Sequence, residues 1–228
     1  MQKTALLSLL KIPFVHQQPY ANLGDWFDRL VPLWQLRLYL MEICGQTDFY
    51  KDLYERCIQM NDAPYSHGQW QLAFVYNCCV AAHKDLRPFF RKWGWLTPVE
   101  MEIHDYGTDT LSIKQHDIDI LNRKIDALYL PNLTAAVEYI TDDNLSLYQK
   151  DEAFISGKFL IDDKMQIQVK DCQGAVAFEV YDGNTLIGVS HHDTFKLSLP
   201  PTTVTDKLKV MAVLPDGRRI KCEREFIK

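Results

Sequence analysis

The sequence lacks the short motifs on which most hydrolases and nucleotide-binding proteins depend. It contains no His-Glu-x-x-His, which holds zinc in many metallopeptidases, and no Gly-x-Ser-x-Gly, which positions a serine nucleophile. Its ten glycines are spread singly, so no glycine-rich loop can cradle a phosphate. No Cys-x-x-Cys pair supports a thiolate zinc site. The motifs alone therefore assign no catalytic residue.

Long apolar runs and an excess of positive charge are also missing. No apolar run approaches the length of about 18 residues that predicts a membrane span. The net charge of −5 and the pI of about 5.8 argue against a nucleic-acid partner. The apolar run Ala5 to Leu10 is interrupted by Ser8, and no small-x-small cleavage site follows it. We interpret this segment as a helix and not as a signal peptide.

Histidines, cysteines and paired carboxylates offer little for a metal or for a nucleophile. His191 and His192 are adjacent, so one ion is not expected to take both, and no His-x-x-x-His pair occurs elsewhere. We expect most of the six cysteines to be buried free thiols. Glu100 and Glu102 are interpreted as part of a solvated face. The prediction for this chain is no metal ligand and no catalytic residue.

The first part of the chain has the apolar spacing of helices. The predicted helices cover residues 28–44, 48–60 and 69–83, a short stretch after Asp85, and 112–128. Asp28 is expected to cap the first, with Pro32 in an early turn, and Gly45 to end it. Ser112-x-x-Gln115 is interpreted as a capping box.

After about residue 154 the pattern changes to an alternation with period two. Six or seven short strands are expected, with tight turns at Asp182-Gly-Asn184 and Asp216-Gly217. The predicted fold class is α+β and multidomain. An α-helical subdomain (1–140) and a linker (141–153) precede an antiparallel, immunoglobulin-like β-sandwich (154–228).

All five tryptophans fall in the helical part. Aromatic rings carry large buried areas, so a core position is the simpler interpretation for each. Exposed tryptophans would instead suit a glycan ligand. Trp93 and Trp95 flank Gly94, so we expect them to face different ways, with one of them exposed.

Several segments, in this order, resemble the C-terminal portion of enhancin-like metallopeptidases, the mucin-degrading gluzincins of peptidase family M-sixty. The resemblance spans roughly residues 20–228, and its second half is similar to Bacteroides-type members. The segments are Leu30-Val-Pro-Leu-Trp-Gln-Leu36, Phe49-Tyr-Lys-Asp-Leu-Tyr54, Phe90-Arg-Lys-Trp-Gly-Trp-Leu-Thr-Pro98, Asp105-Tyr-Gly107, Phe178-Glu-Val-Tyr-Asp-Gly183 and Ala212-Val-Leu-Pro-Asp-Gly-Arg218.

The resemblance implies a zinc peptidase whose His-Glu-x-x-His segment lies upstream of this chain. The cofactor prediction is therefore none in this chain, with zinc expected only together with the missing upstream segment. The helical part would form one wall of the substrate cleft. By position, Asp105 and Tyr106 are the first candidates for cleft-facing residues, and Tyr106 would donate to an oxyanion. Trp34 and Gln35 come next.

Three origins remain open for such a chain: a fragment of a larger enzyme, the product of a truncated gene, or a stand-alone module. The first functional hypothesis is the C-terminal lobe of a zinc metallopeptidase acting on mucin-type O-glycoproteins, non-catalytic as it stands. The alternative is a non-enzymatic carbohydrate- or glycoprotein-binding or interaction module. The implied partners are a glycoprotein or glycan and the missing N-terminal catalytic lobe. The resemblance implies an extracellular or cell-surface location.

Overall fold

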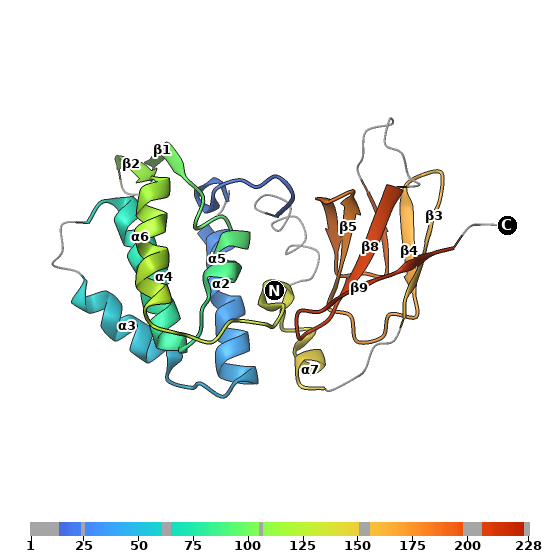
Figure 1. Cartoon of the computed structure of the whole chain (residues 1–228), viewed down its shortest axis with the longest axis horizontal. Helices are drawn as coiled ribbons and strands as arrows, with labels where there is room; N and C mark the ends of the chain where they lie inside the picture. The colour runs from blue at the N-terminus through green and yellow to red at the C-terminus, as the bar shows by residue number, and fades with distance from the viewer. Residues whose placement is uncertain are drawn as a thin grey trace. The chain divides into compact units, whose positions relative to one another are not determined.

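A computed structural model describes most of the chain, namely residues 14–23, 26–60, 65–104, 107–150, 156–197 and 207–225. The described chain divides into two compact units. A helical unit ends at Leu133, and a β unit begins at Thr134. Each unit is described by itself below (Figure 1).

The helical unit holds most of the helices and one β-hairpin. The helices predicted over 28–44, 48–60 and 69–83 are confirmed, with bounds that shift by a few residues. The elements are η2 (Tyr20–Asn22), α2 (Trp26–Arg37), η3 (Leu38–Ile43), α3 (Phe49–Gln59), α4 (His67–Ala82), α5 (Arg87–Lys92), β1 (Val99–His104), β2 (Thr108–Ile113) and α6 (Gln115–Asp126).

The first long helix changes its winding halfway along. α2 starts before Asp28, so Asp28 lies in its first turn and Pro32 lies inside the helix, contrary to the predicted cap and early turn. After Arg37 the chain continues as η3, a π-helical stretch in which the Cys44 amide donates to the Tyr39 carbonyl at 2.9 Å. Gly45 follows with a φ of 70°, as expected for a glycine that ends a helix.

α4 is the central helix of its unit and contacts both α3 and α6. Its buried residues include Leu72, Val75 and Cys78, as the apolar sequence predicts. Ser66 caps it in a capping box with Gln69. The box predicted at Ser112 is wrong, because that residue lies in β2. Ser66 and Ser112 are each followed by a glutamine three positions later, so the sequence alone does not distinguish the true capping box from the false one.

Trp93 and Trp95 are both buried, so the expectation that one of them is exposed is wrong. Gly94 between them has a φ of 75°, which turns the chain and lets both rings enter the core. A Cβ at Gly94 would lie 2.4 Å from the carbonyl oxygen of Gln18. Trp95 packs against Tyr20 at a centroid distance of 4.2 Å.

An ion network holds α5 and α6 together. The Arg87 guanidinium reaches Asp85 at 2.6 Å and Asp126 at 2.7 Å. It also donates to the backbone carbonyl of Asn122 at 3.1 Å. Burial raises the pKa of Asp85, but the hydrogen bonds and the charge of Arg87 outweigh burial, and the net pKa is below its ordinary value.

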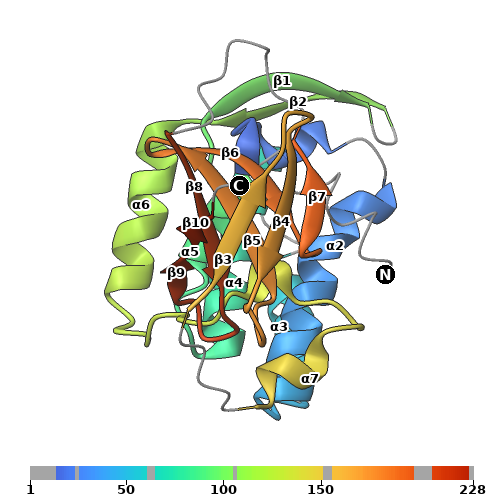
Figure 2. The same cartoon turned by 90° about the vertical axis from the view of Figure 1, so that its right-hand side faces the viewer.

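The β unit consists of two four-stranded sheets that form two layers (Figures 1 and 2). One sheet has the order β10-β3-β4-β7 and the other β6-β5-β8-β9. All pairings are antiparallel except that of β10 with β3. The elements are η4 (Val137–Tyr139), α7 (Leu145–Tyr148), β3 (Lys158–Ile161), β4 (Gln166–Lys170), β5 (Ala177–Asp182), β6 (Thr185–Ser190), β7 (Thr194–Lys196), β8 (Leu208–Val213), β9 (Arg219–Lys221) and β10 (Glu223–Arg224).

The two sheets share one hydrophobic core. The predicted inward sets meet there: Ile167 and Val169 from one sheet pack in the same cluster as Phe178, Val180 and residues of β8 from the other. The period-two pattern that predicted these strands is visible in β4, where buried and exposed residues alternate. The α+β fold class is thereby confirmed.

A buried carboxylate lies at the centre of a polar network in the β unit. The side chain of Glu179 is 3% exposed and makes two contacts with Arg219, at 2.8 and 2.9 Å. The Tyr139 and Tyr181 hydroxyls donate to it at 2.7 and 2.8 Å. Burial raises the pKa of Glu179, but Arg219 and the two hydroxyls outweigh burial, so the net pKa is below its ordinary value.

Candidate functional site

The four residues predicted from the sequence to face a substrate lie in different environments or outside the described residues. Asp105 and Tyr106 lie outside the described residues, between β1 and β2. Trp34 is 40% exposed on α2. Gln35 is fully buried and accepts a hydrogen bond from the indole nitrogen of Trp93 at 3.1 Å. The side chain of Gln35 therefore belongs to the core of the helical unit.

Trp34 lies on an apolar strip of α2 that faces solvent. Phe27, Leu30 and Trp34 are 79%, 53% and 40% exposed. Their spacing of three and four residues places them on one side of the helix. We call these three residues the α2 surface. Exposed apolar strips of this kind are typical of surfaces that bind a ligand or another protein.

Charged groups border the α2 surface at one end. The guanidinium carbon of Arg37 lies 4.8 Å from the ring centroid of Trp34, a cation–π distance. Arg37 also pairs with Glu42 at 2.9 Å. These contacts hold the indole in place, and a sugar ring would have to stack on the face of Trp34 that Arg37 leaves open.

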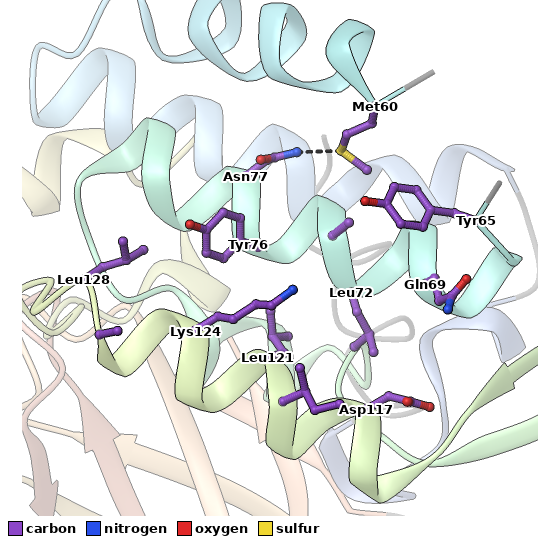
Figure 3. A pocket seen from close by; sticks show the side chains of 13 residues that line it. Met60, Tyr65, Gln69, Leu72, Tyr76, Asn77, Asp117, Leu121, Lys124 and Leu128 are labelled. Carbon is purple, nitrogen blue, oxygen red and sulfur yellow. Dashed lines mark hydrogen bonds between the residues drawn. The ribbon is translucent and has the colours of Figure 1, made fainter. Parts of the chain in front are cut away.

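A second candidate is a hollow between α4 and α6, with a cavity volume of about 720 Å³ (Figure 3). We call it the α4–α6 groove. Apolar side chains such as Leu72 and Leu121 line it together with Tyr65 and Tyr76. Its polar lining residues are Gln69, Asn77, Asp117 and Lys124. A mostly apolar pocket with a few polar groups is the usual form of a site for a small or amphipathic ligand.

One polar group of this groove is engaged within the protein. Asn77 is buried, and its side-chain amide donates to the sulfur of Met60 at 2.6 Å, across from α4 to the end of α3 (Figure 3). Lys124 and Asp117 extend from α6. The groove can therefore offer one positive and one negative group to a ligand above an apolar floor.

Within the described ranges, no group of three or more His, Cys, Asp or Glu side chains could hold a metal ion. Two histidine–carboxylate pairs occur near the hairpin. His67 contacts Asp109 at 2.8 Å, and His104 contacts Glu102 at 3.0 Å. Both pairs are exposed. Glu102 thus has a histidine partner on its own strand, on the solvated side predicted for it.

The two adjacent thiols of α4 are poor nucleophiles. Cys78 and Cys79 are completely buried. Burial raises the pKa of Cys79 to about 12 and raises that of Cys78 well above its ordinary value. Neither thiol forms a thiolate near neutral pH. For these two the prediction of buried thiols is confirmed, but only three of the six cysteines, Cys78, Cys79 and Cys222, are buried, so the expectation that most of them are buried is wrong.

Comparison with known proteins adds the family context. The family described as peptidase M60, enhancin and enhancin-like matches residues 13–94. A search of curated proteins found no match. The resemblance to enhancin-like metallopeptidases inferred from the sequence is thus confirmed for the helical part of the chain, which holds α2, α3, α4 and the Trp93–Gly94 turn.

Solved structures share the fold over nearly the whole chain. A metallopeptidase from Bacteroides thetaiotaomicron is 22% identical with a TM-score of 0.77, and the match covers 94% of this chain and 41% of that one. A metallopeptidase in complex with Tn antigen gives the same identity and TM-score, with 94% and 45% covered. The ZmpB metallopeptidase from Clostridium perfringens is 14% identical with a TM-score of 0.61, with 97% and 39% covered.

The chain spans less than half the length of these metallopeptidases. It has the fold of part of such an enzyme. No helix among the residues described is long and apolar enough to cross a membrane.

Proposed function

We propose that this chain forms a non-catalytic lobe of an enhancin-like zinc metallopeptidase that acts on mucin-type O-glycoproteins. The observation that carries the proposal is the combination of the family match over residues 13–94 with a metallopeptidase fold over 94% of the chain. One of the similar structures holds Tn antigen, which is the reason for choosing an O-glycoprotein as the substrate class.

The zinc would be bound by residues outside this chain. The sequence has no His-Glu-x-x-His, and the described residues contain no cluster of metal ligands. In a zinc peptidase, three protein ligands hold the ion, and a glutamate activates the bound water. All four groups would come from another segment of polypeptide. This lobe would contribute substrate contacts, with Trp34 and, from sequence resemblance, Asp105 and Tyr106 as the candidates.

The β unit is proposed to be an immunoglobulin-like sandwich of the kind that follows the peptidase domain in Bacteroides-type members. Its two sheets with a common core support this interpretation. A glycoprotein substrate implies an extracellular or cell-surface location, which we propose for this protein as well.

The alternative function is a glycoprotein-binding module without hydrolysis. The exposed aromatic side chain of Trp34 favours it, because an indole at a surface can stack on a sugar ring. Under this alternative the chain alone binds an O-glycopeptide. Under the lobe hypothesis the chain alone neither binds zinc nor cleaves.

The first experiment is elemental analysis of the dialysed protein after incubation with zinc, combined with digestion of an O-glycopeptide. We expect far less than one equivalent of zinc and no cleavage. Stoichiometric zinc with chelator-sensitive cleavage would show that the chain is itself a peptidase, and the proposal would be wrong.

Calorimetric titration with a GalNAc-threonine peptide separates the lobe from the binding module. Saturable binding that is lost in Trp34→Ala supports the binding module and places the glycan on the α2 surface. Tyr129→Ala is the matched control, because Tyr129 is an exposed aromatic residue of the same unit, 92% exposed and distant in sequence from α2. The unglycosylated peptide controls for binding through the peptide alone.

A further inference from the structure

Two cysteines of the β unit lie where the chain passes from one sheet to the other. β4 ends at Lys170 in the first sheet, and the chain enters the second sheet with β5 at Ala177, so Cys172 lies on this crossover. β9 ends at Lys221 in the second sheet, and β10 begins at Glu223 in the first. Cys222 is the single residue between β9 and β10, on this second crossover.

The two sulfur atoms already touch. Sγ of Cys172 lies 3.8 Å from Sγ of Cys222, although 50 positions separate the residues in the sequence. A disulfide needs about 2.05 Å between the sulfurs and Cβ atoms about 3.5–4.5 Å apart. Because the sulfurs are already 3.8 Å apart, we expect side-chain rotation to supply most of this movement.

Of the two thiols, Cys172 is the more accessible to solvent. Cys222 is 1% exposed, and its amide donates to the Val210 carbonyl at 2.8 Å, which ties it to β8. Cys172 is half-buried and therefore within reach of a small molecule. We therefore expect Cys172 to react first with a small disulfide, and the enclosed Cys222 to react second.

We propose that Cys172 and Cys222 form a disulfide that joins the crossover from β4 to β5 to the crossover from β9 to β10. The oxidant is a small-molecule disulfide, for example glutathione disulfide. In the first step the Cys172 thiol exchanges with it, which forms a mixed disulfide and releases one small thiol. In the second step the sulfur of Cys222 attacks the sulfur of Cys172 and expels the second small thiol. Two protein thiols are oxidised and one small disulfide is reduced, so atoms and electrons balance.

The experiment uses the full chain, fully reduced and then incubated with glutathione disulfide. Acid quenching, alkylation and non-reducing digestion are followed by mass spectrometry. We expect one peptide that joins Cys172 to Cys222. Because the closed loop is long, we also expect the melting temperature of the β unit to rise on the order of 10 °C over that of the reduced protein.

Variants separate this pair from the other thiols. Cys172→Ser should lose both the joined peptide and the rise in melting temperature. Cys44→Ser and Cys57→Ser, at an exposed and a half-buried thiol, should keep both. If Cys172→Ser fails to fold, the joined peptide and the melting temperature are compared between the oxidised and the reduced wild-type protein instead.

Three results would overturn the proposal. These are free thiols at both positions, glutathione attached to Cys172 without closure, and a joined peptide whose formation leaves the melting temperature unchanged. The inference does not depend on the proposed function, because it concerns only the thiols and the stability of the β unit.

Discussion

Replacing Arg219 with methionine should destabilise the β unit strongly, because it leaves Glu179 buried without its cation. Methionine keeps much of the apolar stem of arginine and removes the guanidinium. Glu179 is 3% exposed and would retain only the hydroxyls of Tyr139 and Tyr181 as donors. Breaking a buried ion pair from one side typically costs about 3–5 kcal/mol. Since the Arg219 side chain is 30% exposed, we expect a loss of about 3 kcal/mol in the free energy of unfolding.

The neighbouring Arg218 supplies the control. It pairs with Asp216, and the two side chains are 61% and 50% exposed. An exposed pair of this kind contributes at most about 1 kcal/mol, so Arg218→Met should be nearly neutral. Urea unfolding followed by far-ultraviolet circular dichroism measures both variants, and amide exchange within β5 and β8 shows which unit opens. A loss for Arg219→Met within about 1 kcal/mol of the loss for Arg218→Met would refute the reasoning.

The pH dependence adds an independent check of the same network. In the wild type the pKa of Glu179 is lowered, so its contribution is present above the pKa of the unfolded chain and is lost as the pH falls through the folded value. Without Arg219, which also contacts the buried Glu138 at 3.3 Å, Glu179 keeps the two hydroxyls, and we expect burial to raise its pKa. The carboxyl group then protonates in the folded state as the pH falls. The difference in stability between wild type and Arg219→Met should therefore narrow at acid pH.

Further predictions concern both units. Gly94→Ala should cost about 2 kcal/mol or more in thermal or urea unfolding, because a Cβ would meet the Gln18 carbonyl at 2.4 Å, whereas Gly45→Ala, with a similar φ and open space around it, should cost only about 1 kcal/mol. Gln35→Leu should cost about 1–3 kcal/mol, since it leaves the Trp93 N–H buried without this acceptor. The lowered pKa of Asp85 predicts stability that is lost as the pH falls below about 4, and Asp85→Asn should remove that part of an acid titration.

Local pattern was enough to predict the long helices and the strands of the β unit. The apolar residues of α4 and the alternation around Ile167 and Val169 show which face of each element is buried. This pattern can be read from a few neighbouring residues, so it needs no knowledge of distant contacts. The same reasoning missed the hairpin of β1 and β2. Half of its strand residues are exposed and only two are buried, and the mostly polar sequence from Thr108 to Ser112 resembles a loop and a helix cap.

The candidate sites depend on contacts between segments that are distant in the sequence. The local sequence pattern does not reveal such contacts. Gln35 is buried because Trp93, 58 positions later, donates a hydrogen bond to it. The α4–α6 groove exists because α6 packs beside α4, with Met60 at the end of α3 reaching Asn77. The sequence left Trp34 open between a core position and a cleft-facing position, and the structure shows that it is 40% exposed.

The π-helical stretch η3 has a consequence for how relatives of this chain should be aligned. A wide turn of this kind accommodates one extra residue within an otherwise α-helical segment. Deleting one residue of this stretch other than Glu42, the partner of Arg37, would let the stretch rewind as an α-helix, while α2 and Trp34 stay where they are. Each residue of an α-helix turns the chain by about 100°, so the approach to α3 would change instead. Single-residue gaps between Leu38 and Ile43 are therefore the length changes that evolution could make here without disturbing the α2 surface.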